Sequence, residues 1–170
     1  MTCLKYNFEF ENDKIKITSP NDESINFGLK STIQLNPFYF DGQLIIKNKK
    51  IENIIDNLLI NALNYNEEYL GNFNGVLKIK FKDLKNKLIK KGEIDFLVNE
   101  NKLVLDNIIF TLDGIGDVES FIKLKETEGV IKFFSSNKLT ISNHIEFAKV
   151  FQIGSKKIKN VKEIQFDLEK

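Results

Sequence analysis

The residues that could act as a nucleophile or a general base are few. The chain contains one histidine, His144, and one cysteine, Cys3. No cysteine or acidic nucleophile stands at a motif spacing from His144, so no nucleophile–base pair can be assembled. One cysteine and one histidine also exclude a cysteine-based zinc site or a multi-histidine metal site within one chain. We therefore expect no catalytic residue, no metal and no cofactor.

Two glycines and two aspartates gather at residues 113–117, where Asp113 and Asp117 flank the sequence Gly114-Ile115-Gly116. A phosphate loop would need a third glycine and a following helix, and here a strand pattern follows. A calcium site would need further ligands at EF-hand spacing, and none is present. The segment is more typical of a tight hairpin turn.

Glu67 and Glu68 are adjacent, so their side chains point in different directions and form a poor pair for glycoside hydrolysis. Lys78, Lys80 and Lys82 form a basic row on one face of a strand. Such a row is typical of a solvated face that resists aggregation. The alternative is contact with anionic lipid headgroups.

The composition indicates one domain with a sizeable core. The chain has 170 residues, 42% hydrophobic and 29% charged, and a net charge of +1, which gives no electrostatic case for nucleic acid. All its basic residues are lysines, so bidentate arginine clamps for phosphate are excluded. No window reaches the roughly 18 apolar residues of a membrane-spanning helix. Residues 1–10 do not resemble a signal peptide, which taken literally predicts a cytoplasmic protein.

Alternation of apolar and polar residues dominates the chain and predicts a mainly β fold, an antiparallel meander. Near the C-terminus it predicts a strand at 129–134 and a separate short strand at Leu139 and Ile141. Each strand has one apolar face. The inward residues that we expect to form the functional surface are Leu77, Ile79, Phe81, Ile94, Phe96, Leu103, Leu105, Phe110 and Leu112.

The period changes to that of an amphipathic helix at residues 49–64. Its polar side is rich in asparagine and acids, which suits packing on a sheet better than binding anionic lipid. A second, short helix is expected at 144–151, with Asn143 as its N-cap.

Several segments between residues 69 and 153 resemble the C-terminal region of AsmA-like envelope proteins, a family that includes the YhdP and TamB types. These segments are LGNFNG at 70–75, KGEIDF at 91–96, KLVLDNIIFTLD at 102–113 and FAKVFQ at 147–152. The resemblance implies a curved β-sheet whose apolar concave face forms a groove for lipids. It also implies a periplasmic protein, anchored in the inner membrane through a segment absent from this chain.

Two interpretations of the apolar face remain open. In the first, the chain is a segment of a longer, repeating β-groove protein that binds or conducts phospholipid or another acyl-chain lipid, supports outer-membrane assembly and contacts other envelope proteins. In the second, the chain is a single structural or interaction domain, with a closed core and no lipid. A sheet with one apolar face must cover it with a second sheet, a helix or bound acyl chains.

Overall fold

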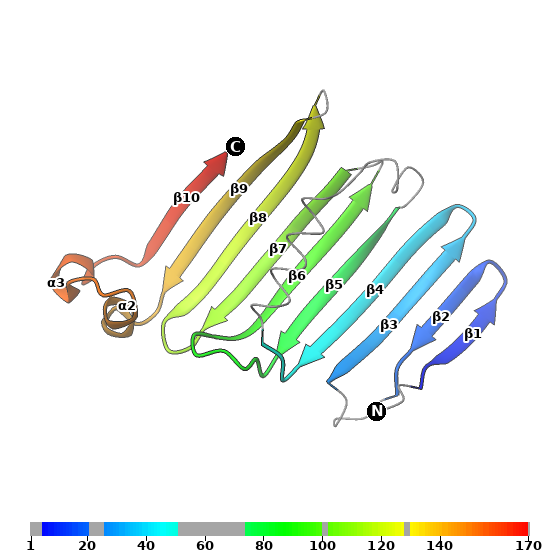
Figure 1. Ribbon diagram of the computed structural model, residues 1–170, viewed down its shortest axis with the longest axis horizontal. Coiled ribbons are helices and arrows are strands. Elements are labelled where there is room, and N and C mark those ends of the chain that lie inside the picture. The colour runs from blue at the N-terminus through cyan, green and yellow to red at the C-terminus, as the bar shows by residue number, and fades with distance from the viewer. Residues whose placement is uncertain (1–4, 21–25, 51–73, 100–101, 128–129, 170) are drawn as a thin grey trace.

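The computed structural model describes residues 5–20, 26–50, 74–99, 102–127 and 130–169. These residues form one ten-stranded sheet, in which the strands follow the order of the sequence, and two short helices (Figure 1). The strands are β1 (Asn7–Glu11), β2 (Lys14–Thr18), β3 (Phe27–Leu35), β4 (Phe38–Lys47), β5 (Gly75–Lys82), β6 (Ile89–Asn99), β7 (Lys102–Leu112), β8 (Gly116–Thr127), β9 (Val130–Ile141) and β10 (Glu163–Glu169). The expectation of a mainly β fold is confirmed.

Neighbouring strands are antiparallel at every pair except β4 and β5, which run parallel. The predicted meander is therefore interrupted once. A parallel pair needs a crossover connection, and residues 48–74 connect β4 to β5 in the sequence. The helix expected at 49–64 lies almost entirely outside the described residues, and Lys49 and Lys50 are not helical.

Turn residues with left-handed backbone conformations join several of the strands. Asn12 has a φ of 50° between β1 and β2, and Gly114 has a φ of 67° between β7 and β8. Asparagine and glycine tolerate this region better than other residues. The segment at 113–117 is thus the hairpin turn that its sequence predicts.

The expected short helix near the C-terminus is present as α2 (His144–Val150), and α3 (Ser155–Ile158) follows it. The Asn143 side chain accepts hydrogen bonds from the backbone N–H groups of Ile145 and Glu146, at 3.1 and 3.2 Å. This bond pattern satisfies two N–H groups that a helix start leaves without partners. Asn143 is therefore the N-cap that the sequence predicts.

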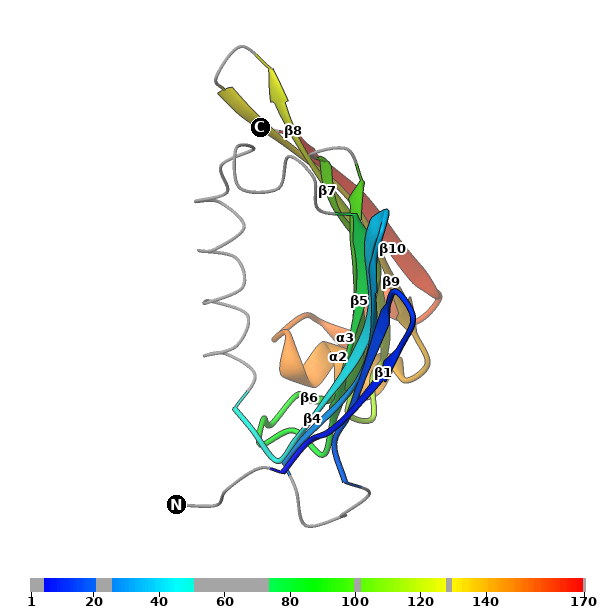
Figure 2. The ribbon, with the colours of Figure 1, turned by 90° about the vertical axis from the view of Figure 1, so that its right-hand side faces the viewer.

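The sheet is curved, and the two helices lie on its concave side (Figure 2). Phe147 and Ala148 of α2 and Ile158 of α3 pack against Leu112, Ile115 and Ile141, where β7 and β9 end. A second, larger cluster of buried residues lies at the centre of the sheet and includes Ile46, Ile79, Phe81 and Ile94. The buried apolar residues thus gather in two neighbouring groups along one face.

Candidate functional site

One face of the sheet is apolar from the first strand to the last. Because antiparallel and parallel partners that lie opposite each other project to the same face, the strand register shows which residues form a row. One row crosses all ten strands as Phe8, Ile17, Ser31, Gly42, Leu77, Phe96, Leu105, Ile122, Ser135 and Leu168. We call the face that bears this row the apolar face.

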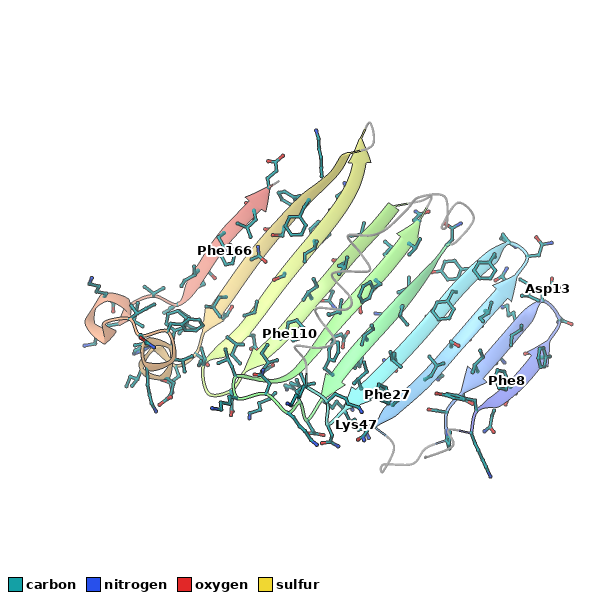
Figure 3. All side chains as sticks on the ribbon, viewed as in Figure 1. Phe8, Asp13, Phe27, Lys47, Phe110 and Phe166 are labelled. Atoms are coloured by element: carbon teal, nitrogen blue, oxygen red, sulfur yellow. The ribbon has the colours of Figure 1, made fainter. Side chains whose placement is uncertain are left out.

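A second row on the apolar face runs from β3 to β10. Its members are Phe27, Ile46, Phe81, Gly92, Phe110, Val118, Leu139 and Ile164. Figure 3 labels Phe27 and Phe110 in this row, together with Phe8 and Phe166 on the two edge strands. The apolar face therefore extends over the whole width of the sheet.

Gly92 is the one member of the second row without a side chain, and aromatic rings fill its place. The rings of Phe81 and Phe110, from the strands on either side of β6, have centroids 6.0 Å apart. A Cβ atom built on Gly92 would overlap Cδ1 of Phe110. Glycine at this position thus allows two aromatic rings to meet across the strand between them.

A β-bulge in β7 keeps the apolar residues of this strand on one face. The register shifts between Leu105 and Ile108, where Asn107 has a φ of 50° and its N–H donates to the Asp106 carboxylate at 2.8 Å. Without the extra residue, strict alternation would place Leu105 and Ile108 on opposite faces. Both are buried here.

Eight of the nine residues predicted for the functional surface have described side chains, and they share the apolar face. Five of them are buried: Ile79, Phe81, Ile94, Leu105 and Leu112. Leu77, Phe96 and Phe110 are half-buried, and Leu103 lies in β7. The structure thus brings these residues together, and solvent reaches the half-buried ones best.

Five exposed apolar residues lie on the edge strands, which the sequence did not single out. Phe10 on β1 is 76% exposed, and Phe166 on β10 is 49% exposed. Phe8, Ile164 and Leu168 are also exposed. Their alternation was visible in the sequence, but their exposure depends on the strand order, which alternation does not specify.

The opposite face carries the predicted lysine row, and acidic residues of β6 pair with two of its members. The Lys78 ammonium lies 3.3 Å from the Asp95 carboxylate, and the Lys80 ammonium lies 3.3 Å from the Glu93 carboxylate. Lys82 is exposed. The first two lysines therefore contribute to strand pairing, which leaves less free positive charge for lipid headgroups than the sequence alone suggested.

One exposed ion pair shifts the pKa of both partners. At the β1–β2 hairpin, the Lys16 ammonium donates a hydrogen bond of 3.0 Å to the Glu11 carboxylate. This bond, together with the attraction of the two charges, lowers the pKa of Glu11 and raises the pKa of Lys16. Because both groups are exposed, the pair contributes little to stability.

The residues considered for catalysis do not form a site in the described part of the chain. His144 begins α2, and Asp113 lies 3.5 Å from Lys90. Asp117 accepts a hydrogen bond of 2.7 Å from the Thr111 hydroxyl. Within the described ranges, no group of three or more histidine, cysteine, aspartate or glutamate residues could hold a metal ion. Cys3, Glu67 and Glu68 lie outside these ranges.

An open depression of about 290 Å³ lies over β7, β8 and β9 beside the bulge. Its lining mixes charged, polar and apolar residues, including Asn107, Glu119, Phe121 and Lys138. No pattern in the sequence indicates this depression, because it depends on the bulge and on contacts between three strands.

Comparison with protein families, curated proteins and solved structures yields no match to this chain. Among the described residues, no helix is long and apolar enough to cross a membrane. The apolar face is therefore the feature from which a function can be argued.

Proposed function

We propose that this chain is a non-enzymatic, AsmA-like envelope protein whose apolar face binds or conducts lipid acyl chains. The proposal places it in the bacterial periplasm, held at the inner membrane, where it moves lipid between membranes or supports outer-membrane assembly. Its partner would be a phospholipid or another acyl-chain lipid. The observation that supports this most is the row from Phe8 on β1 to Leu168 on β10, which crosses all ten strands on one face and is apolar except at Ser31, Gly42 and Ser135.

The dimensions of the apolar face suit acyl chains. Strands lie about 4.8 Å apart, so ten strands span about 43 Å from β1 to β10. The hydrocarbon core of a bilayer is about 30 Å thick and contains two layers of acyl chains. The face is thus wide enough for two acyl chains placed end to end. Each buried methylene would contribute about 0.8 kcal/mol without any polar partner.

The exposure of the residues indicates where lipid should make contact. The centre of the face is closed, since Ile79 is 3% exposed and Phe81 is 1% exposed. The half-buried Phe96 and the exposed Phe166 are more accessible. Lipid is therefore expected at the accessible members of the first row, such as Phe96, and at the β10 edge.

Site-specific photo-crosslinking with the probe at Phe96 or Phe166 tests this proposal. Leu97 is the matched control, because it is apolar and 37% exposed but lies next to Phe96 on the opposite face. We expect lipid adducts at positions 96 and 166 and none at position 97, in protein purified from cells or mixed with phospholipid vesicles. Adducts at all three positions, or at none, would contradict the proposal.

A second candidate function is a structural or interaction domain with a closed core and no lipid ligand. The burial of Ile79, Phe81 and Ile94 at the centre of the face favours it. This candidate predicts only protein crosslinks at position 96. It also predicts that solvent extraction of the purified, folded chain recovers no lipid and that the chain unfolds in one cooperative transition.

A further inference from the structure

The segment from α2 to the start of β10 exposes four large apolar residues. Ile145 is 67% exposed, Val150 and Phe151 are each 44% exposed, and Ile153 is 38% exposed. We call these four residues the exposed apolar group. They lie within nine consecutive positions, whereas single exposed apolar residues scattered over a surface are ordinary.

Buried neighbouring residues hold the exposed apolar group in place. Phe147, Ala148 and Ile158 are buried against the ends of β7 and β9. The rings of Phe147 and Phe151 have centroids 4.7 Å apart, and the Asn143 cap holds the first turn of α2. The exposure of the group is therefore a property of the folded structure.

The same segment is strongly basic, although the chain as a whole has a net charge of only +1. Residues 144–162 contain five lysines, at 149, 156, 157, 159 and 162, and one carboxylate, Glu146. Glu146 lies 3.5 Å from the Lys149 ammonium. Lys157, Lys159 and Lys162 are exposed and begin four residues after the last member of the exposed apolar group.

We propose that the segment 144–162 docks on a membrane surface that contains anionic lipids. Aliphatic and phenylalanine side chains partition into the boundary between headgroups and acyl chains, while lysine ammonium groups bind anionic headgroups. A segment that exposes both kinds of residue matches both layers of such a membrane. The charge distribution of the segment thus selects an anionic bilayer as its partner.

The position of segment 144–162 in the fold determines which part of the sheet a bound membrane would meet. The helices α2 and α3 lie on the concave side of the sheet, where β7 and β9 end (Figure 2). A bilayer bound there would meet one end of the apolar face. This consequence of docking rests on the proposed lipid function and deepens it. The docking itself can be measured separately from any lipid contact along the strands.

A tryptophan probe tests the docking directly, because the chain contains no tryptophan. In the full chain, we would replace Phe151 with tryptophan and record its emission with vesicles of phosphatidylcholine alone or mixed with phosphatidylglycerol. We expect a blue shift, together with flotation of the protein, only with the anionic vesicles. The control is Tyr39→Trp, an exposed position near the start of β4, which should show no shift.

Charge variants separate the lysines of this segment from the general charge of the protein. Replacing Lys157, Lys159 and Lys162 with glutamine should weaken binding to anionic vesicles about a hundredfold. The matched control replaces Lys5, Lys14 and Lys30, three exposed lysines near the opposite edge of the sheet, and should bind as the parent does. The double substitution Ile145→Ser with Val150→Ser should weaken binding about tenfold, because less apolar surface would be buried in the membrane. Both positions are exposed, so the variant should still fold.

Three outcomes would overturn the docking proposal. These are no blue shift with anionic vesicles, equal binding to both kinds of vesicle, and undiminished binding after loss of the three lysines. Lipid adducts at Phe96 with no docking by the segment would leave the proposed function in place and reject the docking alone. Docking without adducts at Phe96 would support the segment and reject lipid contact along the strands.

Discussion

Gly92 is the position on β6 where aromatic residues of the two neighbouring strands meet. We expect Gly92→Ala to lower the free energy of unfolding by about 1–3 kcal/mol, because the new methyl group would overlap the Phe110 ring. The Ile109 carbonyl oxygen, 2.8 Å from the place that the methyl carbon would take, limits any shift of the strand. Urea unfolding measures the change.

Gly28 on β3 is the matched control for this substitution. A Cβ atom at Gly28 would meet Ser19 and Ile45 at 3.6 and 3.7 Å, which are ordinary contacts. Gly28→Ala should leave stability unchanged or raise it by up to about 1 kcal/mol, since alanine loses less backbone entropy than glycine. In a Phe110→Leu background, Gly92→Ala should lower the free energy of unfolding by less than it does in the parent. Equal losses at the two glycines would show that the ring contact across β6 does not matter.

At the scale of single residues, the sequence predicted which side chains share a face but not how deeply each is buried. Leu105 and Ile108 illustrate the reason. The pair Asp106-Asn107 suggests a local irregularity, and the bulge there places both apolar residues on one face. Their burial depends on neighbouring strands, and no pattern within β7 carries that information.

The α2 helix depends on its cap, since seven residues are too few for a helix that is stable alone. We expect Asn143→Ala to cost about 1 kcal/mol of unfolding free energy, because two N–H groups would lose their acceptor. Amide exchange at residues 147–151 should accelerate as well. Asn143→Asp keeps a side-chain acceptor and should retain both stability and protection. An unchanged exchange rate in Asn143→Ala would show that packing of Phe147 alone holds the helix.

The strand β9 shows where element boundaries could not be predicted. Alternation predicted one strand at 129–134 and another at Leu139 and Ile141, but β9 runs without a break from Val130 to Ile141. The polar residues Ser135, Ser136 and Asn137 caused the error, because such clusters usually mark turns. In the structure, β8 and β10 pair with this stretch on both sides, and the Asn137 amide donates to Ser135 at 3.0 Å. Pairing across the sheet overrode the local preference.

At the scale of the whole molecule, hairpin connections made most of the sheet predictable. A turn between two alternating strands nearly always places them side by side, so the antiparallel pairs that short turns join followed from the sequence. The pair of β9 and β10 is different, because residues 142–162, with α2 and α3, separate these strands. The parallel pairing of β4 with β5 did not, because 27 residues, 48–74, separate the two strands and alternation carries no information on direction. The strand order then decides that β1 and β10 form the edges.

Both edge strands carry carboxylates on the face opposite to their apolar residues, and these charges should oppose pairing between copies of the chain. Glu9 and Glu11 lie on β1, and Glu163, Asp167 and Glu169 lie on β10. If two copies paired through the same edge, carboxylates would lie beside carboxylates, which is destabilising. We expect Asp167→Asn with Glu169→Gln to associate at a concentration about tenfold lower than the parent, as measured by sedimentation velocity.

A proline added to the Asp167→Asn, Glu169→Gln variant, which we call the neutralised variant, tests whether this association uses the backbone of β10. The Ile141 N–H donates to the Lys162 carbonyl at 2.7 Å, and an antiparallel ladder alternates, so the N–H of Gln165 points away from β9. Gln165→Pro removes this outward donor and spares the β9 ladder, so it should return the neutralised variant to the behaviour of the parent. Association that persists with proline at position 165 would instead place the contact on the exposed side chains of Phe166 and Leu168, and Phe166→Ser should then abolish it.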